Sequence, residues 1–517
     1  MNALRALIAH VAYATLSPVL WLLHVSGICS GPLALRGFEN LRWRLGRLGV
    51  WIRFQSASRN VPAYARMLRR DGFRLPKARL GITDIPAMDK ENYVKAYPLE
   101  ARCVGGSLPQ HGLMLDESSG SSGLPTNWVR GVAERNANRR SLKFGVRNRL
   151  GTKDLFFINA FALGPWATGI NLTLSMAQWT RIKTVGPDIS KIEHTLQQFG
   201  THHHYVIIGY PPFLKQLVDR ASINWTRYNV SMLYGGEGMS ESMRRYLLDR
   251  GIGRVYGSYG ASDLELNMAA ETDFTIALRR LLESRPDVAE RVLEHHGAMP
   301  MIFQFNPADF FFETNEEGEL FVTICRPRYV APKIRYNIHD VGHVLRMPRL
   351  RELLAECGVA ADDLGADALD LPLLFHYGRS DSTVAYYGCK IPPADVQEAL
   401  FRQPALASGV DAFQLRTYDD EEGDKRLEIA LEITDVALSF RAGHWTRVLY
   451  DALAEVNQDF RESRRMVPPG KEPTLEMHDA GEGPFAGADI RIKRSYVRIG
   501  ASMDQSASLP EALTGRA

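Results

Sequence analysis

Short apolar runs alternate with segments of helical spacing through the middle of the chain. The runs at 154–161 (DLFFINAF) and 204–210 (HYVIIGY) have the length and apolar content of buried strands. Residues 211–221 (PPFLKQLVDRA), directly after the second run, repeat apolar positions at helical spacing. This alternation predicts an α/β architecture in which functional groups gather where the strands end.

A glycine turn interrupts the next apolar run. Residues 231–239 (SMLYGGEGM) indicate a strand that breaks into a turn, and 240–252 (SESMRRYLLDRGI) indicate the helix that follows. Ser240 is the expected N-cap of this helix, and Gly251 is its expected C-terminal stop. Further strands are expected at 254–260 (RVYGSYG) and 318–325 (GELFVTIC).

The pattern changes after residues 375–381 (FHYGRSD). Shorter strand-like and helix-like segments follow there, such as 395–401, 426–434 and 445–460. A chain of 517 residues also exceeds what one hydrophobic core holds. The expected organisation is an N-terminal segment at 1–50, a large α/β domain at 51–380, a small α+β domain at 381–500 and a disordered tail at 501–517.

The N-terminal segment has its own pattern. Ala6–Ile28 contains no Asp, Glu, Lys or Arg and has the length of a membrane-spanning helix, although His10, His24 and Pro18 interrupt its apolar character. An arginine-rich stretch with aromatic residues follows it. Two interpretations stay open: a pair of helices packed on the main domain, or an anchor through residues 1–55 at a membrane whose cytoplasmic side carries the body of the protein.

Charge and cysteine content narrow the class of protein. The 62 basic residues are nearly matched by 59 acidic ones, and this balance gives no indication of nucleic-acid binding. The five cysteines are scattered, without CxxC pairs or metal-ligand spacing, which is typical of a reduced protein in the cytoplasm.

A serine–glycine run stands out at 118–123, within LDESSGSSGLPTNW. Its hydroxyls and closely approachable backbone N–H groups suit a polyphosphate. No lysine follows the glycines, so the run is not the GxxxxGK loop of P-loop NTPases. A plain linker is the alternative.

Five motifs in order resemble those of the adenylate-forming superfamily of acyl- and aryl-CoA synthetases, in particular the phenylacetate-CoA ligase branch. The resemblance covers roughly residues 50–500. The motifs are SSGSSGLPT (118–126), YGGEGMS (234–240), YGASDLE (259–265), GELFVTICRPRYVAPKIRYNIHDVG (318–342) and YGRSDSTVAYYGCKIPPADVQEAL (377–400).

The resemblance implies a large N-terminal α/β domain of several layers, a small mobile α+β C-terminal domain and a two-step reaction. A carboxylate attacks the α-phosphate of ATP, and a thiol, usually that of CoA, then displaces AMP. Tyr259 resembles the aromatic residue that stacks on adenine, and Asp340 the carboxylate that binds the ribose hydroxyls. The full set of nucleotide-binding residues implied is Ser118, Ser119, Gly120, Ser121, Ser122, Gly123, Thr126, Gly235, Gly236, Glu237, Tyr259, Gly260, Ala261, Ser262, Asp340 and Arg379.

Asp263 stands where the family usually has a glutamate that binds Mg²⁺ through ATP. Both are hard oxygen ligands, although the aspartate is one carbon shorter, and Glu265 is the alternative ligand. Arg379 resembles the arginine near the ribose and phosphate, so Asp263 and Arg379 are both expected to serve catalysis.

The C-terminal part supplies a hinge and a catalytic lysine in this family. Asp381 matches the hinge about which the small domain turns. Lys493 is the expected lysine that stabilises charge on phosphorus, and Arg491 competes for that position because the usual Gly-Lys pair is absent.

The acyl pocket is expected beside the 204–221 segment, with walls from Phe161, Trp166, His204, Tyr210 and Tyr234. Core aromatics are the alternative role for these side chains. The triplet His202–His204 is not expected to bind metal, because adjacent residues of a strand face opposite sides. No structural zinc is expected either, since the interval between the adenine motif and Asp340 contains only one cysteine.

The sequence therefore predicts an AMP-forming acid–thiol ligase that uses ATP, Mg²⁺ and an aromatic or medium-chain carboxylic acid, with CoA as acceptor. Two alternatives stay open. One is a ligase with an amine, hydroxyl or carrier-protein thiol as acceptor, and the other is a catalytically weak protein that binds nucleotide or acyl groups.

Overall fold

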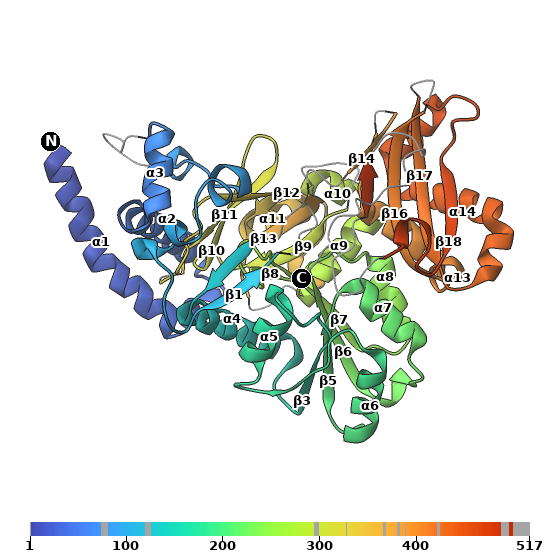
Figure 1. Cartoon of the computed structure of the whole chain (residues 1–517), viewed down its shortest axis with the longest axis horizontal. Helices are drawn as coiled ribbons and strands as arrows, with labels where there is room; N and C mark the ends of the chain where they lie inside the picture. Colours follow the sequence, from blue (N-terminus) through green and yellow to red (C-terminus); the bar gives the residue numbers. More distant parts are fainter. Residues whose placement is uncertain are drawn as a thin grey trace, which may run out of the picture. The chain divides into compact units, whose positions relative to one another are not determined.

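The protein is represented by a computed structural model whose chain folds into two compact units. The first unit runs from Met1 to Asp381 and the second begins at Ser382 (Figure 1). The structure describes residues 2–73, 81–118, 126–293, 299–326, 328–365, 369–379, 383–387, 389–420, 424–487 and 496–499.

The large unit is organised by one mixed sheet of eleven strands. Their order is β10-β11-β12-β13-β9-β8-β7-β6-β5-β3-β4. One half is parallel and consists of β3 (Leu155–Asn159), β4 (Arg181–Thr184), β5 (His204–Gly209), β6 (Asn229–Gly235) and β7 (Arg254–Tyr259). The other half is antiparallel and consists of β8 (Ala269–Ala270), β9 (Met301–Phe305), β10 (Phe310–Thr314), β11 (Glu319–Ile324), β12 (Tyr336–Leu345) and β13 (Leu373–Arg379).

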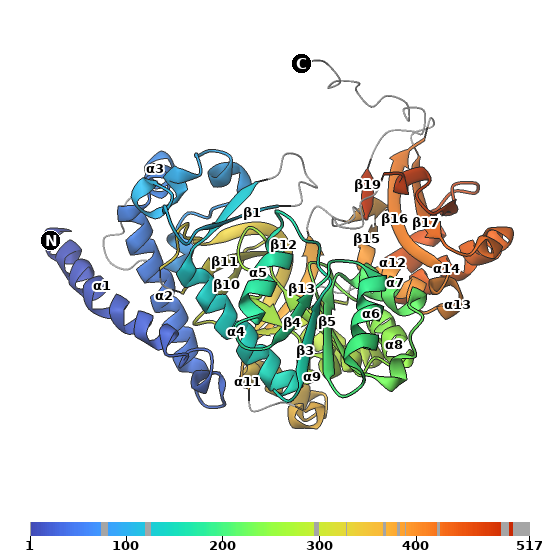
Figure 2. The ribbon, with the colours of Figure 1, turned by 60° about the horizontal axis from the view of Figure 1, so that its bottom comes forward.

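Helices cover both faces of the parallel strands. Figures 1 and 2 show α6, α7 and α8 on one face and α5 on the other, as right-handed crossovers require when the strand order reverses. These helices are α5 (Ala167–Met176), α6 (Ile189–Phe199), α7 (Pro211–Arg220) and α8 (Glu241–Asp249). Three further helices, α9 (Asp273–Ser284), α10 (Pro286–Val292) and α11 (Met347–Glu356), share a buried core with β9 and β13.

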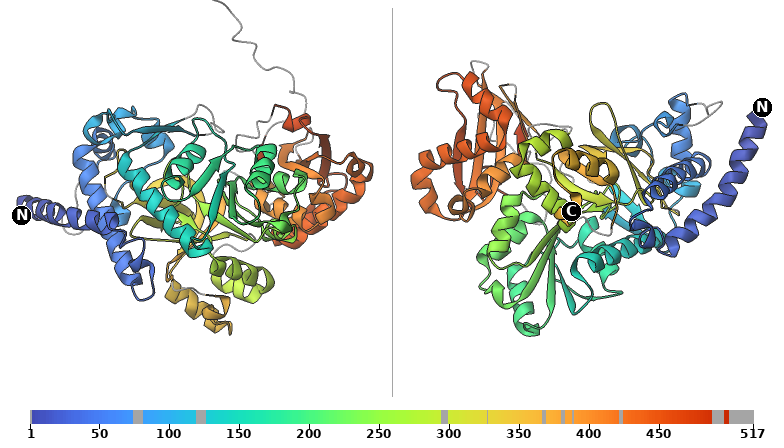
Figure 3. Two further views of the ribbon diagram at one scale, coloured as in Figure 1. Left: turned by 90° about the horizontal axis from the view of Figure 1, so that it is seen from below. Right: turned by 180° about the vertical axis from the view of Figure 1, so that it is seen from behind.

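The N-terminal helices belong to the large unit. They are α1 (Asn2–Val25), α2 (Glu39–Asn60) and α3 (Pro62–Arg70), and α1 lies at the edge of the unit, next to α2 (Figure 3). Two glycines, Gly46 and Gly49, let α2 approach the backbone at Pro307 and the side chain of Cys325 closely. Among the helices that the structure describes, none is both long and apolar enough to cross a membrane.

A hairpin and a long helix connect these helices to the sheet. Strands β1 (Met114–Glu117) and β2 (Asn127–Arg130) form an antiparallel pair around the serine–glycine run. Helix α4 (Val132–Leu150) follows, with the Glu134 side chain accepting the backbone N–H of Gly131 at its first turn.

The small unit contains a four-stranded mixed sheet in the order β18-β17-β16-β19 and a separate hairpin of β14 and β15. The strands are β14 (Val384–Tyr386), β15 (Cys389–Ile391), β16 (Val410–Asp419), β17 (Lys425–Ile433), β18 (Thr474–Asp479) and β19 (Val497–Ile499). The helices are α12 (Pro393–Phe401), α13 (Pro404–Ala407), α14 (Ala442–Val456) and α15 (Gln458–Ser463).

The structure confirms the predicted fold class, with a large α/β unit followed by a smaller one that combines a mixed sheet with helices. The strands expected at 154–161, 204–210 and 254–260 are β3, β5 and β7. The Ser240 hydroxyl accepts the backbone N–H of Met243 at 3.1 Å, so the predicted N-cap of α8 is confirmed.

Candidate active site

A buried carboxylate in the antiparallel half of the sheet contacts a tyrosine at the end of the parallel half. Asp340, in β12, is 7% exposed, and its Oδ2 accepts the hydroxyl of Tyr259 at 2.6 Å. His376 Nε2 lies 3.2 Å from the same oxygen. Burial opposes ionisation, but the His376 imidazole and the Tyr259 hydroxyl hold the pKa of Asp340 below its ordinary value.

Arg379 is placed opposite this carboxylate by strand register. It ends β13 and pairs with Asp340 in the antiparallel ladder between β12 and β13. The Arg379 charge also contributes to the lowered pKa of Asp340. The structure therefore brings together Tyr259, Asp340 and Arg379, three of the residues predicted to bind nucleotide. His376 was not predicted, because a lone strand histidine gives no signal until its partner is known.

The ring of Tyr259 is enclosed by other aromatic rings. Its centroid lies 4.9 Å from that of His376, 5.8 Å from that of Phe303 and 6.2 Å from that of Phe312. Burial and the adjacent Asp340 raise the pKa of the Tyr259 hydroxyl well above its ordinary value, so this hydroxyl stays a hydrogen-bond donor.

The turn after β7 presents the predicted magnesium ligand. A side chain at Gly260 would collide with the backbone of Glu265 and Leu266, so only glycine allows this tight turn. Asp263 Oδ2 accepts the hydroxyl of Tyr336 at 2.8 Å, and Asp263 Oδ1 lies 3.3 Å from the Ser262 hydroxyl.

Glu265, the alternative magnesium ligand, points elsewhere. Its Oε1 accepts the hydroxyl of Tyr329 at 3.0 Å, and its two oxygens lie 3.9 Å from Arg130 and 4.0 Å from Arg326. Arg130 also donates to the backbone carbonyl of Ser262 at 2.7 Å. Glu265 is 2% exposed and belongs to a buried ion-pair cluster, which favours Asp263 for the metal.

Glycine and aromatic residues meet at the ends of β5 and β6. The rings of Phe161 and Tyr210 pack edge to face with centroids 4.8 Å apart. Gly236 has a positive φ of 83° and abuts the Tyr210 ring, where a side chain would collide. Phe161, Tyr210, Gly235 and Gly236 thus form one group. Trp166 is the N-cap residue of α5 and pairs with Glu117 at the end of β1.

Two residues predicted for the acyl pocket lie away from this group. His204 begins β5, at the strand end opposite Tyr210, and its Nε2 lies 2.8 Å from the Ser231 hydroxyl. The Tyr234 hydroxyl donates to Glu271 at 3.0 Å in the interior. Tyr234, Glu241, Arg244, Glu271 and Arg279 form a set of buried side chains that we call the Glu271 network.

Several predicted residues fall outside the described part of the chain: Ser119, Gly120, Ser121, Ser122, Gly123, Asp381, Arg491 and Lys493. The residues that flank the serine–glycine run are described. Ser118 Oγ accepts the backbone N–H of Thr126 at 3.0 Å, and the Ser118 N–H donates to the Thr126 carbonyl at 3.0 Å. These two bonds close the hairpin at the base of the run.

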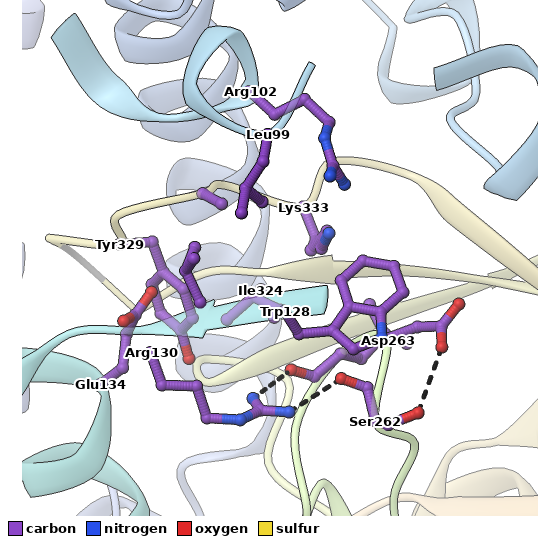
Figure 4. Close-up of a pocket in the computed structure, with 13 residues that line it drawn as sticks. Leu99, Arg102, Trp128, Arg130, Glu134, Ser262, Asp263, Ile324, Tyr329 and Lys333 are labelled. Carbon is purple, nitrogen blue, oxygen red and sulfur yellow. Dashed lines mark hydrogen bonds between the residues drawn. The ribbon is translucent and has the colours of Figure 1, made fainter. Parts of the chain in front are cut away.

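A pocket opens next to Asp263, between the β1–β2 hairpin and the loop before β12 (Figure 4). Arg102, Lys333 and Trp128 line it together with Asp263, and we call it the Arg102–Lys333 pocket. The sequence prediction assigned no role to Arg102, which lies outside the five motifs, or to Lys333, which lies within the motif at 318–342.

The predicted histidine triplet lies at the start of β5. The rings of His202 and His203 have centroids 3.9 Å apart. Within the described ranges, no group of three or more His, Cys, Asp or Glu residues is placed to hold a metal ion.

Comparisons with known proteins show what this architecture resembles. No protein-family model matches the chain, and no curated protein matches it either. Among solved structures, the chain is similar to a 2-hydroxyisobutyryl-CoA ligase in complex with 2-HIB-AMP and CoA, with a TM-score of 0.51 and 16% identity over 91% of this chain and 92% of that one. An amide bond synthetase from Marinactinospora thermotolerans gives a TM-score of 0.44 and 14% identity over 72% of this chain and 68% of that one. The first of these similarities shows that the chain has the fold of adenylate-forming enzymes.

Proposed function

We propose that this chain is an AMP-forming ligase that activates an aromatic or medium-chain carboxylic acid with ATP and transfers the acyl group to a thiol, with CoA as the default acceptor. The observation that carries the proposal is the ionised, buried carboxylate of Asp340 beside Tyr259 and opposite Arg379. The fold of adenylate-forming enzymes supports it.

In the first step, an oxygen of the acid attacks the α-phosphorus of ATP. The bond from that phosphorus to pyrophosphate breaks, and the acyl-adenylate forms. Asp340 accepts the ribose hydroxyls, because a carboxylate with a lowered pKa is ionised and has acceptor capacity. Arg379 places positive charge near the phosphate, where negative charge increases as the bond breaks.

The nucleotide base would lie along the glycines at the end of β6. Gly235 and Gly236 leave the backbone accessible, and Glu237 is the next residue. The Tyr259 ring packs on its neighbours at the end of β7, and its hydroxyl holds Asp340. Gly260, Ala261 and Ser262 continue this surface toward Asp263.

The protein supplies part of the ligand set that Mg²⁺ needs. Mg²⁺ is commonly held by one or two carboxylates together with substrate phosphates and water, and Asp263 offers one carboxylate here. Asp263 would hold the ion on the ATP phosphates, where the bound ion supplies charge neutralisation. Tyr336 and Ser262 orient the Asp263 carboxylate for this role.

The second step needs the thiol to attack the acyl carbonyl so that AMP leaves. We assign the acyl group to the space beside Phe161 and Tyr210, with Trp166 at its edge. Lys493, with Arg491 as rival, is the proposed cation on the transferring phosphorus. Asp381 is the proposed hinge between a large domain at 51–380 and a small domain at 381–500. The N-terminal residues 1–55 are the proposed region of any peripheral membrane contact.

A different acceptor is the second candidate. Loops on a shared fold set the chemistry, so the fold leaves the acceptor open. An amine, a hydroxyl or a carrier-protein thiol would leave the first step unchanged.

The test is exchange of labelled pyrophosphate into ATP with Mg²⁺ and a panel of aryl and medium-chain acids. We expect exchange that depends on one class of acid and falls by roughly ten- to a hundredfold in Asp340→Ala, since charged hydrogen bonds to the ribose are lost. Asp362→Ala is the control, because Asp362 is an exposed aspartate paired with Arg36 and Arg351. Exchange at the wild-type rate in Asp340→Ala would reject the proposed mechanism.

The acceptor is tested separately by acid-dependent AMP release with CoA or an amine. Release with CoA supports the thiol ligase, and release with an amine alone supports the second candidate. Nucleotide binding without exchange for any acid would favour a catalytically weak binding protein.

A further inference from the structure

The Arg102–Lys333 pocket contains two buried cations that form no ion pair with any described residue. Arg102 and Lys333 are each 6% exposed. Among the described residues, neither side chain forms a hydrogen bond or an ion pair, and Arg102 Nε is buried without an acceptor. The Lys333 ammonium lies over two rings instead, 4.2 Å from the Trp128 centroid and 5.2 Å from that of Tyr336.

Two other buried cations of the large unit have a carboxylate partner. Arg130 contacts Asp116 at 2.6 Å, and Lys215 contacts Asp219 at 2.8 Å. Burying a cation without a partner costs free energy that such pairs offset. The pocket therefore retains two charged groups whose stabilisation the fold itself does not provide.

A third unmet donor, the indole N–H of Trp128, lies on the Asp263 side of its ring (Figure 4). Trp128 is 4% exposed, and its indole N–H has no acceptor among the described residues. A guanidinium, an ammonium and an indole are all donors without acceptor capacity. Figure 4 shows Arg102 and Lys333 reaching toward the space beside Trp128 and Asp263.

The acidic residues of the pocket are already engaged. Glu134 accepts the backbone N–H groups of Gly131 and Val330, and Asp263 accepts the Tyr336 hydroxyl. Asp263 attracts the Lys333 ammonium, but it forms no ion pair with that ammonium in the described structure. An anion with several acceptor atoms would satisfy the donors of Arg102 and Lys333.

We infer that Arg102 and Lys333 form a buried subsite for a phosphate oxyanion beside the ring of Trp128. Two cations match a doubly charged phosphoryl group better than a single carboxylate, and a planar guanidinium binds two phosphate oxygens at once. The phosphate has two sources: the pyrophosphate end of ATP, which rests on the proposed function, or free inorganic phosphate, which does not.

The test measures binding of inorganic pyrophosphate and of inorganic phosphate to the full chain by calorimetry, in the wild type, Lys333→Met and Arg102→Met. We expect pyrophosphate to bind the wild type and each variant to weaken binding by on the order of tenfold or more, the effect of one lost charge-assisted bond. Two variants at separate positions keep the test valid if one of them fails to fold.

A second readout uses the ligand-free protein. Lys333→Met should raise the melting temperature, because an unpaired buried charge is removed. The matched control Lys215→Met should lower it, because that variant leaves Asp219 without its lysine. Variants that bind pyrophosphate as the wild type does, or a wild type that binds neither anion, would overturn the inference.

Binding experiments with Mg·ATP distinguish the two sources of the phosphate. If the ATP tail occupies the subsite, pyrophosphate competes with Mg·ATP, and both variants weaken Mg·ATP binding. If the subsite takes free phosphate, the variants lose phosphate binding and keep Mg·ATP binding. Pyrophosphate binding that depends on Lys333, without exchange for any acid, would sustain the subsite while the proposed ligase activity fails.

Discussion

The Glu271 network and the Arg102–Lys333 pocket are both clusters of buried charge in the large unit. The cations of the first have carboxylate partners, and those of the second form no ion pair with a described residue. In the Glu271 network, Arg244 is 1% exposed and donates to Glu271 at 2.7 Å and to Glu241 at 2.9 Å. In the pocket, the buried ammonium of Lys333 lies over the rings of Trp128 and Tyr336 and forms no ion pair with a described residue.

The difference shows that burial alone does not separate a structural charge from a functional one. Glu271 also accepts the backbone N–H of Gly257 at 2.6 Å, so the Glu271 network joins β6, β7 and α8 into one closed arrangement. Such an arrangement fixes the strands that carry the candidate site. In the Arg102–Lys333 pocket, by contrast, the donors have no acceptor among the described residues, and a bound anion would supply one.

The largest change in stability should come from disrupting the Glu271 network. Glu271→Gln removes the carboxylate from Arg244 and leaves a buried guanidinium underpaired. We expect the free energy of unfolding to fall by about 3–5 kcal/mol in urea denaturation, as for buried pairs that lose one partner.

A surface pair is the control for this change. Asp287 contacts Arg285 at 2.6 Å, but both side chains are exposed. Asp287→Asn should leave the free energy of unfolding unchanged within measurement error. A loss in Glu271→Gln no larger than in this control would show that the Glu271 network does not hold the strands.

The second prediction concerns the Arg102–Lys333 pocket, where the substitution should raise the free energy of unfolding instead of lowering it. Burial, with Arg102 nearby, lowers the pKa of Lys333 from 10.5 to about 7. Lys333→Met should raise the free energy of unfolding by about 1–3 kcal/mol at pH 6, where the wild type buries the charge.

The destabilisation caused by Lys333 depends on pH, because the folded and unfolded states bind its proton differently. Below pH 7 both folded and unfolded states hold the proton, and the folded state bears the full cost. Between pH 7 and 10.5 the folded state is deprotonated first, so the cost falls as pH rises. The advantage of Lys333→Met over the wild type should narrow by at most about 1.4 kcal/mol per pH unit in this window. A constant gap from pH 7 to 10 would contradict the buried, uncompensated lysine.

The small unit contains an intermediate case, a buried acid with one amide partner. Asp395, 3% exposed, accepts from Asn457 at 2.7 Å, and burial raises the pKa of its carboxyl from 3.8 to about 7. The unfolded chain ionises first, so wild-type stability should fall as pH rises from about 4 to 7.

Asp395→Asn removes this dependence and keeps an acceptor for Asn457. We expect nearly equal unfolding free energies at pH 4 and an advantage on the order of 1–2 kcal/mol for the variant at pH 7. Parallel pH profiles for the two proteins would mean that the Asn457 bond already compensates the buried charge.

The parallel strands could be predicted from sequence because their apolar runs are bounded by turn residues. β5 and β7 lie where the apolar pattern predicts them. Ser240 caps α8 through a hydrogen bond to Met243, a neighbour in sequence. The pairing of Asp340 with Arg379 could not be derived this way, because it depends on the register of two strands far apart in the chain.

Two tyrosines show the same difference between what the local sequence pattern predicts and what depends on tertiary packing. Tyr234 and Tyr259 each end an apolar run beside a glycine, and the sequence pattern treats them alike. Tyr234 meets Glu271 in the interior, whereas Tyr259 meets Asp340. Which carboxylate a side chain reaches is decided by tertiary packing. Lys333 was missed for the same reason, since its burial depends on β2 and the loop before β12.

The smallest effects should separate these two tyrosines. Each hydroxyl donates to a buried carboxylate, so Tyr234→Phe and Tyr259→Phe should each lower the free energy of unfolding by about 1 kcal/mol. They should differ in pyrophosphate exchange. The Tyr259 hydroxyl helps to hold the pKa of Asp340 low, so its loss should raise that pKa and move the acidic limb of the exchange rate to higher pH. Tyr234→Phe should leave that limb in place, because Glu271 keeps Arg244. A shift of equal size in both variants would mean that the limb reports general stability instead of the ionisation of Asp340.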